Sequence, residues 1–193
     1  MNLGALLWQE GACHAAIRQY EMAKEADENF AEAYISLSHA MYFLGRLDGA
    51  LRYSEAAIRL DALSARGHMG LGRALQASGR IEDAIKHFRE AISLNEHLAE
   101  AYEQYAYVKH VSAGDRFIDD LFAALAKRKW QDSERSRLHY AAGKVESDRK
   151  NHKGAFIHWA KGSRLRRKAF EYALVDSRSM QVLSGDGGVS KTN

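Results

Sequence analysis

The chain has 193 residues, of which 46% are apolar and 27% are charged, so its composition predicts a folded core and excludes an intrinsically disordered chain. It contains no proline, which favours long uninterrupted helices, and a single cysteine, Cys13, which excludes an internal disulfide framework and a cysteine-based zinc site. The formal net charge of +3 is divided unevenly, with −3 on residues 1–98 and +6 on residues 99–193.

The most regular feature of the sequence is a repeat of 34 residues. Residues 31–64 and 65–98 align without a gap, and small residues, large apolar residues and a glycine recur at the same positions. Apolar residues fall at helical spacing on both sides of Gly45 and Gly79. Because glycine readily adopts the left-handed conformation that ends many helices, each segment is predicted to form two antiparallel helices joined at its glycine.

The repeat extends in both directions along the chain. Residues 1–30 fit the same positions and predict a partial first repeat with a shortened first helix. Residues 99–135 are predicted to form a divergent fourth repeat, and residues 136–169 a fifth. A C-terminal helix over residues 170–183 and a flexible tail over residues 184–193 are predicted to follow.

The period and the residue pattern resemble those of the tetratricopeptide repeat family. That pattern has an aromatic residue, a leucine followed by a small residue, a glycine, and then Ala-x-x-x-aromatic-x-x-Ala. In residues 65–98 these positions hold His68 in place of the aromatic residue, then Leu71, Gly72, Gly79, Ala84, Phe88 and Ala91. The proline that usually closes the repeat is absent. The resemblance implies an all-α fold, a right-handed α-solenoid of antiparallel helix pairs with about five repeats and a C-terminal helix.

Residues 138–167 carry a more particular pattern. They read Leu-His-Tyr-Ala-x-Gly-Lys, followed by Ala-Phe-x-His-aromatic-x-x-Gly-Ser-x-Leu-Arg-Arg. This pattern resembles the last repeat of bacterial proteins that join tetratricopeptide repeats to a sulfotransferase domain. The phosphate-binding loop of that domain, of the type Pro-Arg-Ser-Gly-Thr, does not occur in the sequence. The resemblance implies a repeat module without its catalytic domain, and a sulfotransferase domain or its substrate as a partner.

No pattern of catalytic or metal-binding residues stands out. The nine histidines show none of the spacings that are typical of metal sites. Cys13 takes the repeat position that Leu47 and Ile81 occupy, which favours a packing role over a reactive thiol. The sequence therefore predicts no catalytic residue, no metal site and no cofactor, and we expect a protein that is not an enzyme.

The first helix of each repeat lines the concave face in the tetratricopeptide family, and here its side chains differ between repeats. Aromatic side chains among hydrogen-bond donors and acceptors are typical of a peptide-binding surface. The candidate partner-binding residues of this groove are His39, Tyr42, Phe43, Met69, Arg73, Gln76, Tyr107, His110 and Lys144. An alternative is that these aromatic residues pack against the neighbouring repeat.

We interpret the sequence as that of a non-catalytic scaffold that binds a protein or peptide in the concave groove. The first alternative is a repeat module associated with a sulfotransferase domain. The second is nucleic-acid binding through the basic region from Lys127 to Lys168, which a solvated helix face explains more simply. Self-association through the N-terminal end is a further hypothesis, because no predicted capping helix covers the apolar residues there, Leu3, Leu6, Leu7 and Trp8.

The sequence also bears on the compartment. No apolar run approaches the roughly 18 residues that a membrane-spanning helix needs, and the first residues lack the features of a signal peptide. A single cysteine suits a reducing compartment. We therefore expect a soluble, cytoplasmic protein without a membrane partner.

Overall fold

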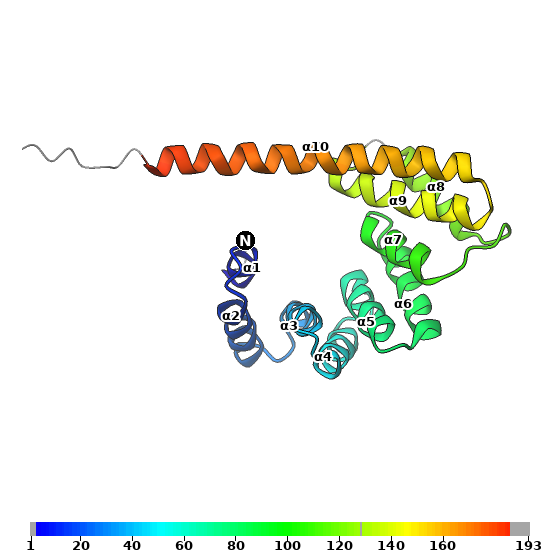
Figure 1. Ribbon diagram of the computed structural model, residues 1–193. Coiled ribbons are helices and arrows are strands. Elements are labelled where there is room, and N and C mark those ends of the chain that lie inside the picture. Colours follow the sequence, from blue (N-terminus) through cyan, green and yellow to red (C-terminus); the bar gives the residue numbers. More distant parts are fainter. Residues whose placement is uncertain (1–2, 128, 186–193) are drawn as a thin grey trace, which may run out of the picture. The chain divides into compact units, whose positions relative to one another are not determined.

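The computed structural model describes residues 3–127 and 129–185, and the side chains as far as Ala169. Every regular element in these residues is a helix, which confirms the all-α prediction (Figure 1). From residue 186 onward, the predicted tail lies outside the described residues. The helices form two compact units, residues 1–110 and residues 111–193.

The unit of residues 1–110 contains seven helices within its described residues. In chain order they are α1 (Leu3–Gln9), α2 (Cys13–Ala26), α3 (Ala31–Phe43), α4 (Leu47–Leu60), α5 (Ala65–Ala77), α6 (Ile81–Leu94) and α7 (Ala99–Val108). Successive helices pack against each other, so that the hairpins α1–α2, α3–α4 and α5–α6 form a stack that α7 continues. This is the solenoid arrangement that the repeat predicts.

The glycines end the first helix of each hairpin as predicted. Gly45 and Gly79 have φ values of 70° and 78°, in the left-handed region that glycine enters without a steric penalty. The backbone N–H of Arg46 donates to the carbonyl of Met41 at 2.9 Å, which closes the turn around Gly45. Lys150 takes the equivalent position in residues 136–169 and has a φ value of 63°. A lysine therefore sits there in a conformation that is strained for a residue with a Cβ atom.

Close packing inside a hairpin depends on a second set of glycines. A Cβ atom added at Gly72 of α5 would lie 2.6 Å from the ring of Phe88 on α6. Gly4 meets the ring of Tyr20 in the same way, at 2.4 Å. These glycines occupy one repeat position, and the aromatic residues occupy another. The two helices of a hairpin can approach this closely because one of them has no side chain at the contact.

Serines replace this glycine–aromatic pair in residues 31–64. The hydroxyl groups of Ser38 and Ser54 both donate to the carbonyl oxygen of Ala50, at 3.0 and 2.7 Å. Both serines are buried, so these bonds satisfy hydroxyl groups that have no access to solvent. The Ser38 bond therefore joins α3 to α4 at this position, whereas the Ser54 bond lies within α4.

The unit of residues 111–193 contains α8 (Phe117–Ala126), α9 (Asp132–Asp148) and α10 (His152–Gly185) within its described residues. The helices α9 and α10 form an antiparallel hairpin in which Gly143 meets the ring of Trp159, as Gly72 meets Phe88. The hydroxyl of Ser136 donates to the carbonyl of Gly162 at 2.8 Å, which joins the two helices near their other end. The helix α10 continues without a break through Gly185 and so extends past the first residues of α9, which lie beside its middle (Figure 1).

None of the helices in the described part of the chain is long and apolar enough to cross a membrane.

We predict opposite effects on stability for two alanine substitutions in α5. The Gly72→Ala variant should lower the free energy of unfolding by roughly 1–3 kcal/mol, because the methyl group overlaps the buried ring of Phe88. The Gly70→Ala variant is the matched control, since the nearest atom to its added Cβ lies at 3.6 Å. It should be neutral or more stable by up to about 1 kcal/mol, because alanine favours the helix. Urea unfolding measures both, and equal effects would contradict this account of the contact.

Candidate functional site

Eight of the nine candidate groove residues lie in the unit of residues 1–110. The helix α3 carries His39, Tyr42 and Phe43, and α5 carries Met69, Arg73 and Gln76. Tyr107 lies in α7, and His110 follows the end of that helix. Seven of these eight residues thus lie on the first helices of three successive repeats, although Met69 is only 5% exposed.

Arg73 is the residue that connects these helices. Its guanidinium lies 4.3 Å from the ring centre of Tyr42 and 5.4 Å from that of Phe43, both on α3. Its Nη1 atom lies 3.3 Å from Oε1 of Glu100 on α7. The Arg73 side chain is only 13% exposed, so these cation–π and ionic contacts are partly shielded from water. Arg73 is therefore held in one position by contacts from two neighbouring helices.

An aromatic cluster surrounds the end of α3. The ring of Phe43 contacts those of His39 and Tyr42, with ring centres 4.6 and 5.7 Å apart. Trp8 from α1 joins the cluster, 5.5 Å from His39 and 5.8 Å from Phe43. Phe43 nevertheless remains 58% exposed. The cluster thus supports an aromatic side chain that faces solvent, and Trp8 belongs to it although the groove prediction omitted this residue.

A pocket of about 150 Å³ lies beside Arg73. Its lining residues are Ile35, Ser38, His39, Tyr42, Arg66, Met69, Gly70, Arg73, Leu98 and Glu100. Four of the predicted groove residues are among them, whereas Phe43, Gln76, Tyr107 and His110 are not. Gly70 has no side chain and so leaves space for the pocket. The repeat pattern does not reveal this role of Gly70.

The charges at the pocket are balanced within the protein. Arg66 pairs with Glu32, and Arg73 pairs with Glu100. Burial lowers the pKa of His39 to about 4, and the positive charges of Arg73 and Arg66 act in the same direction. His39 is therefore neutral near pH 7 and can donate or accept a hydrogen bond. The pocket offers apolar surface with fixed hydrogen-bonding groups at its edge.

The remaining candidates have other surroundings. Tyr107 and His110 are exposed and Gln76 is half-buried, so all three are accessible on the unit of residues 1–110. Lys144 lies on α9 in the other unit, where its Nζ atom is 2.5 Å from Oδ1 of Asp148. The same carboxylate accepts a hydrogen bond from the backbone N–H of Val111 at 3.0 Å. The role of all nine candidates in binding stays a prediction.

Two pairs of histidines occupy equivalent positions in different repeats. The Nδ1 atoms of His68 and His87 lie 3.0 Å apart, and so do those of His139 and His158. The corresponding residues of the second repeat are Tyr34 and Tyr53, whose rings also face each other. The sequence shows no sign of these pairs, because the two members lie 19 residues apart, on the two helices of a hairpin.

The two rings of each pair are in contact, with ring centres 5.2 Å apart in both pairs. His68 also approaches the carbonyl of Ala62 through Nε2, at 3.2 Å, which favours a proton on that atom and leaves Nδ1 to accept a hydrogen bond from His87. Burial lowers the pKa values of His87, His139 and His158, and that of His139 reaches about 4. Among the described residues, no group of three or more His, Cys, Asp or Glu side chains is placed to hold a metal ion.

Comparisons with known proteins agree with this geometry. Residues 31–62 and residues 65–98 each match a model of the tetratricopeptide repeat. No curated protein matches the sequence significantly. Residues 31–62 and 65–98 are thus similar to the tetratricopeptide repeat, at the two repeats that the 34-residue period defines most clearly.

Solved structures extend the likeness to most of the chain. A crystal structure of MamA matches with a TM-score of 0.62 and 24% identity, covering 89% of this chain and 99% of that chain. TTC0263, a tetratricopeptide repeat protein of Thermus thermophilus, matches with a TM-score of 0.58 and 22% identity, covering 89% and 96%. The apo form of RapI matches with a TM-score of 0.66 and 18% identity, covering 87% and 69%. At these identities the matches establish the fold, an all-α solenoid of tetratricopeptide repeats.

The histidine pairs predict that the protein loses stability in mild acid. Histidine in the unfolded chain has a pKa near 6.5, and the folded protein lowers the pKa values of His87, His139 and His158 below it. Below about pH 6.5 the unfolded chain therefore binds more protons than the folded protein does. The stabilisation is complete above this pH and is lost as the pH falls toward 4. Thermal unfolding at pH 7.5, 6 and 5 measures the decline.

A double variant isolates the contribution of one pair. His139→Gln with His158→Gln removes two titrating rings and keeps groups that can bond to each other. Its melting temperature should fall less steeply with pH than that of the unchanged protein. A decline of the same steepness would show that other groups cause the acid sensitivity.

Proposed function

We propose that the protein is a non-catalytic scaffold that binds an extended segment of a partner protein on the surface formed by α3, α5 and α7. The observation that carries this proposal is the position of Arg73, which α3 and α7 hold beside an open pocket. The tetratricopeptide fold supports it, because such repeats expose the first helices of successive hairpins as a continuous binding surface. A cytoplasmic location is part of the same proposal.

The chemistry of the surface favours a peptide with an apolar anchor residue. The pocket is lined by Ile35, Met69 and Leu98, and Phe43 offers an exposed aromatic face beside it. Both arginines of the pocket already pair with a glutamate, so a free carboxylate would have to compete for them. An apolar side chain of the peptide can instead fill the pocket, while His39 or Tyr42 forms a hydrogen bond with the peptide backbone.

The groove proposal is tested with a double variant, Phe43→Ala with Arg73→Ala. Both residues belong to the aromatic and cationic arrangement beside the pocket. The variant should recover the partner from an extract of the native host at least roughly tenfold less than the unchanged protein, since such residues dominate interfaces. Affinity capture with quantitative mass spectrometry measures recovery, and circular dichroism checks that helicity is retained.

The matched control is Leu63→Ala with Arg80→Ala. Leu63 is an exposed apolar residue that follows α4, and Arg80 is an exposed arginine bonded to Asp83, so the control removes the same kinds of side chain outside the pocket. It should leave recovery unchanged. Equal recovery with both double variants would refute binding at this surface.

Association with a sulfotransferase stays a second candidate, which rests on the pattern of residues 138–167. The same capture experiment addresses it, because a sulfotransferase or its substrate would be identified directly among the recovered proteins. Nucleic-acid binding through the basic residues of the second unit is the remaining alternative.

Self-association through the N-terminal helix is a further part of the proposal. Leu3 and Leu6 on α1 are 56% and 37% exposed, although both are large apolar residues. We expect the sedimentation coefficient to rise with protein concentration, and the variant Leu3→Glu with Leu6→Glu to abolish the rise, because charges at this end oppose its burial. Leu63→Glu, a charge at an exposed leucine elsewhere, serves as the control. Sedimentation that does not depend on concentration would refute the proposal.

A further inference from the structure

The hairpin α9–α10 carries a pocket of its own. It has a volume of about 520 Å³ and is lined by residues of both helices. Its lining residues are Arg135, His139, Lys161, Arg164, Leu165 and Lys168, and we name it the cationic pocket. Four of these six side chains carry a positive charge at neutral pH.

The helix register builds this pocket. Lys161, Arg164 and Lys168 follow one another at intervals of three and four residues, so they share one face of α10. Arg135 lies opposite them on α9, and Leu165 provides apolar surface between the cations. Side chains three and four residues apart are those by which one helix contacts another, so this face of α10 suits a helical partner.

The fold of the repeat does not require these cations. The equivalent residues of the third repeat are Ser64, Glu90, Ser93 and His97, none of them lysine or arginine. The apolar residue is the same in both repeats, since Leu94 corresponds to Leu165. The positive charge is therefore an addition to the packing pattern and needs another explanation.

This charge is only partly neutralised within the described residues. Lys168 pairs with Asp132 at 2.9 Å, but Lys161 and Arg164 are exposed and have no acidic partner among the described residues. Residues 111–193 carry 17 Lys and Arg against 10 Asp and Glu, a net charge of +7, whereas residues 1–110 carry 11 against 15, a net charge of −4. A negatively charged ligand would relieve the repulsion among the cations.

Two features of the pocket favour the carboxylates of a peptide over phosphate. Phosphate sites commonly use free backbone N–H groups at a helix N-terminus. Here every lining residue lies within a helix, and even Arg135, near the start of α9, donates its N–H to the carbonyl of Gln131. Only side chains are available to an anion. Leu165 and the ring of His139 add apolar surface, which an amphipathic peptide can use and a phosphate chain cannot.

We propose that the cationic pocket binds an acidic amphipathic segment of a partner protein. Carboxylates at helical spacing pair with Lys161, Arg164 and Arg135, while one apolar side chain of the segment lies on Leu165. This site is additional to the surface of α3, α5 and α7, and it does not depend on that proposal.

The test uses the full chain and a fluorescein-labelled synthetic peptide about four helical turns long, with glutamate on one helical face and leucine at the centre of that face. Fluorescence anisotropy should show binding that weakens as salt is raised, because salt screens the ion pairs. The variant Lys161→Glu with Arg164→Glu should bind roughly tenfold more weakly, as expected for the loss of two ion pairs of moderate strength. Leu165→Ala should weaken binding by about fivefold through lost apolar contact.

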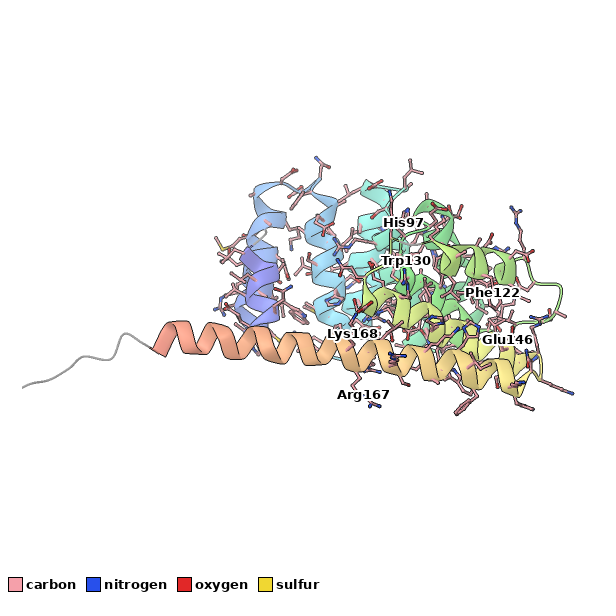
Figure 2. All side chains as sticks on the ribbon, turned by 90° about the horizontal axis from the view of Figure 1, so that it is seen from above. His97, Phe122, Trp130, Glu146, Arg167 and Lys168 are labelled. Carbon is pink, nitrogen blue, oxygen red and sulfur yellow. The ribbon has the colours of Figure 1, made fainter. Side chains whose placement is uncertain are left out.

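The matched control is Arg166→Glu with Arg167→Glu, which changes the same charge on the same helix. Figure 2 shows Arg167 and Lys168 pointing to opposite sides of α10, and neither Arg166 nor Arg167 lines the pocket. This control should alter the affinity less than about twofold, apart from the general effect of net charge seen at low salt.

Three results would overturn the proposal. One is equal weakening by the two double variants, which would indicate a diffuse electrostatic effect. Another is stronger binding of inorganic polyphosphate or of an RNA oligonucleotide with the same number of charges at about 150 mM salt. The third is a concentration-dependent mass of the protein alone that Lys161→Glu with Arg164→Glu abolishes, since a second copy would then be the occupant. Circular dichroism confirms the fold of every variant.

Discussion

The two helices of a hairpin in this protein approach each other where an aromatic ring meets a glycine. Phe88 against Gly72 and Trp159 against Gly143 repeat this contact in both compact units. In the hairpin α3–α4 a hydrogen bond from Ser38 to the carbonyl of Ala50 takes its place. The contact fixes how close the first and second helices lie. Since it faces into the hairpin, it also determines which side chains of the first helix remain on the outer surface. The proposed binding surfaces consist of the side chains that this packing leaves on the outside.

The surface of α3, α5 and α7 derives its order from contacts that form before any ligand binds. Arg73 is held between Tyr42 on α3 and Glu100 on α7, and the ring of Phe43 is supported by its neighbours. Side chains that already occupy one conformation lose little entropy on binding. Specificity at such a surface depends on residues that the repeat pattern does not dictate, which is why repeats with one scaffold can recognise different partners.

The helices of residues 31–98 could be predicted from the sequence because their packing positions recur with a fixed period. Gly45 and Gly79 marked the helix ends for a conformational reason that is local to the residue. The pocket, the contribution of Trp8 and the histidine pairs could not be predicted. Each depends on side chains from two or three helices that meet only in the folded chain, such as His68 and His87. The unbroken course of α10 through Ala169 was equally hidden, because the repeat pattern ends there and a continuing helix carries no capping signal.

The turn at Lys150 is a place where the stability of the fold can be changed without changing either pocket. Its left-handed backbone is strained for any residue with a Cβ atom, and glycine at this position would relieve the strain. The side chain is exposed, and it lines neither of the two pockets. The variant Lys150→Gly should therefore be more stable than the natural chain. Surface substitutions that also weaken the fold can be studied in this more stable variant.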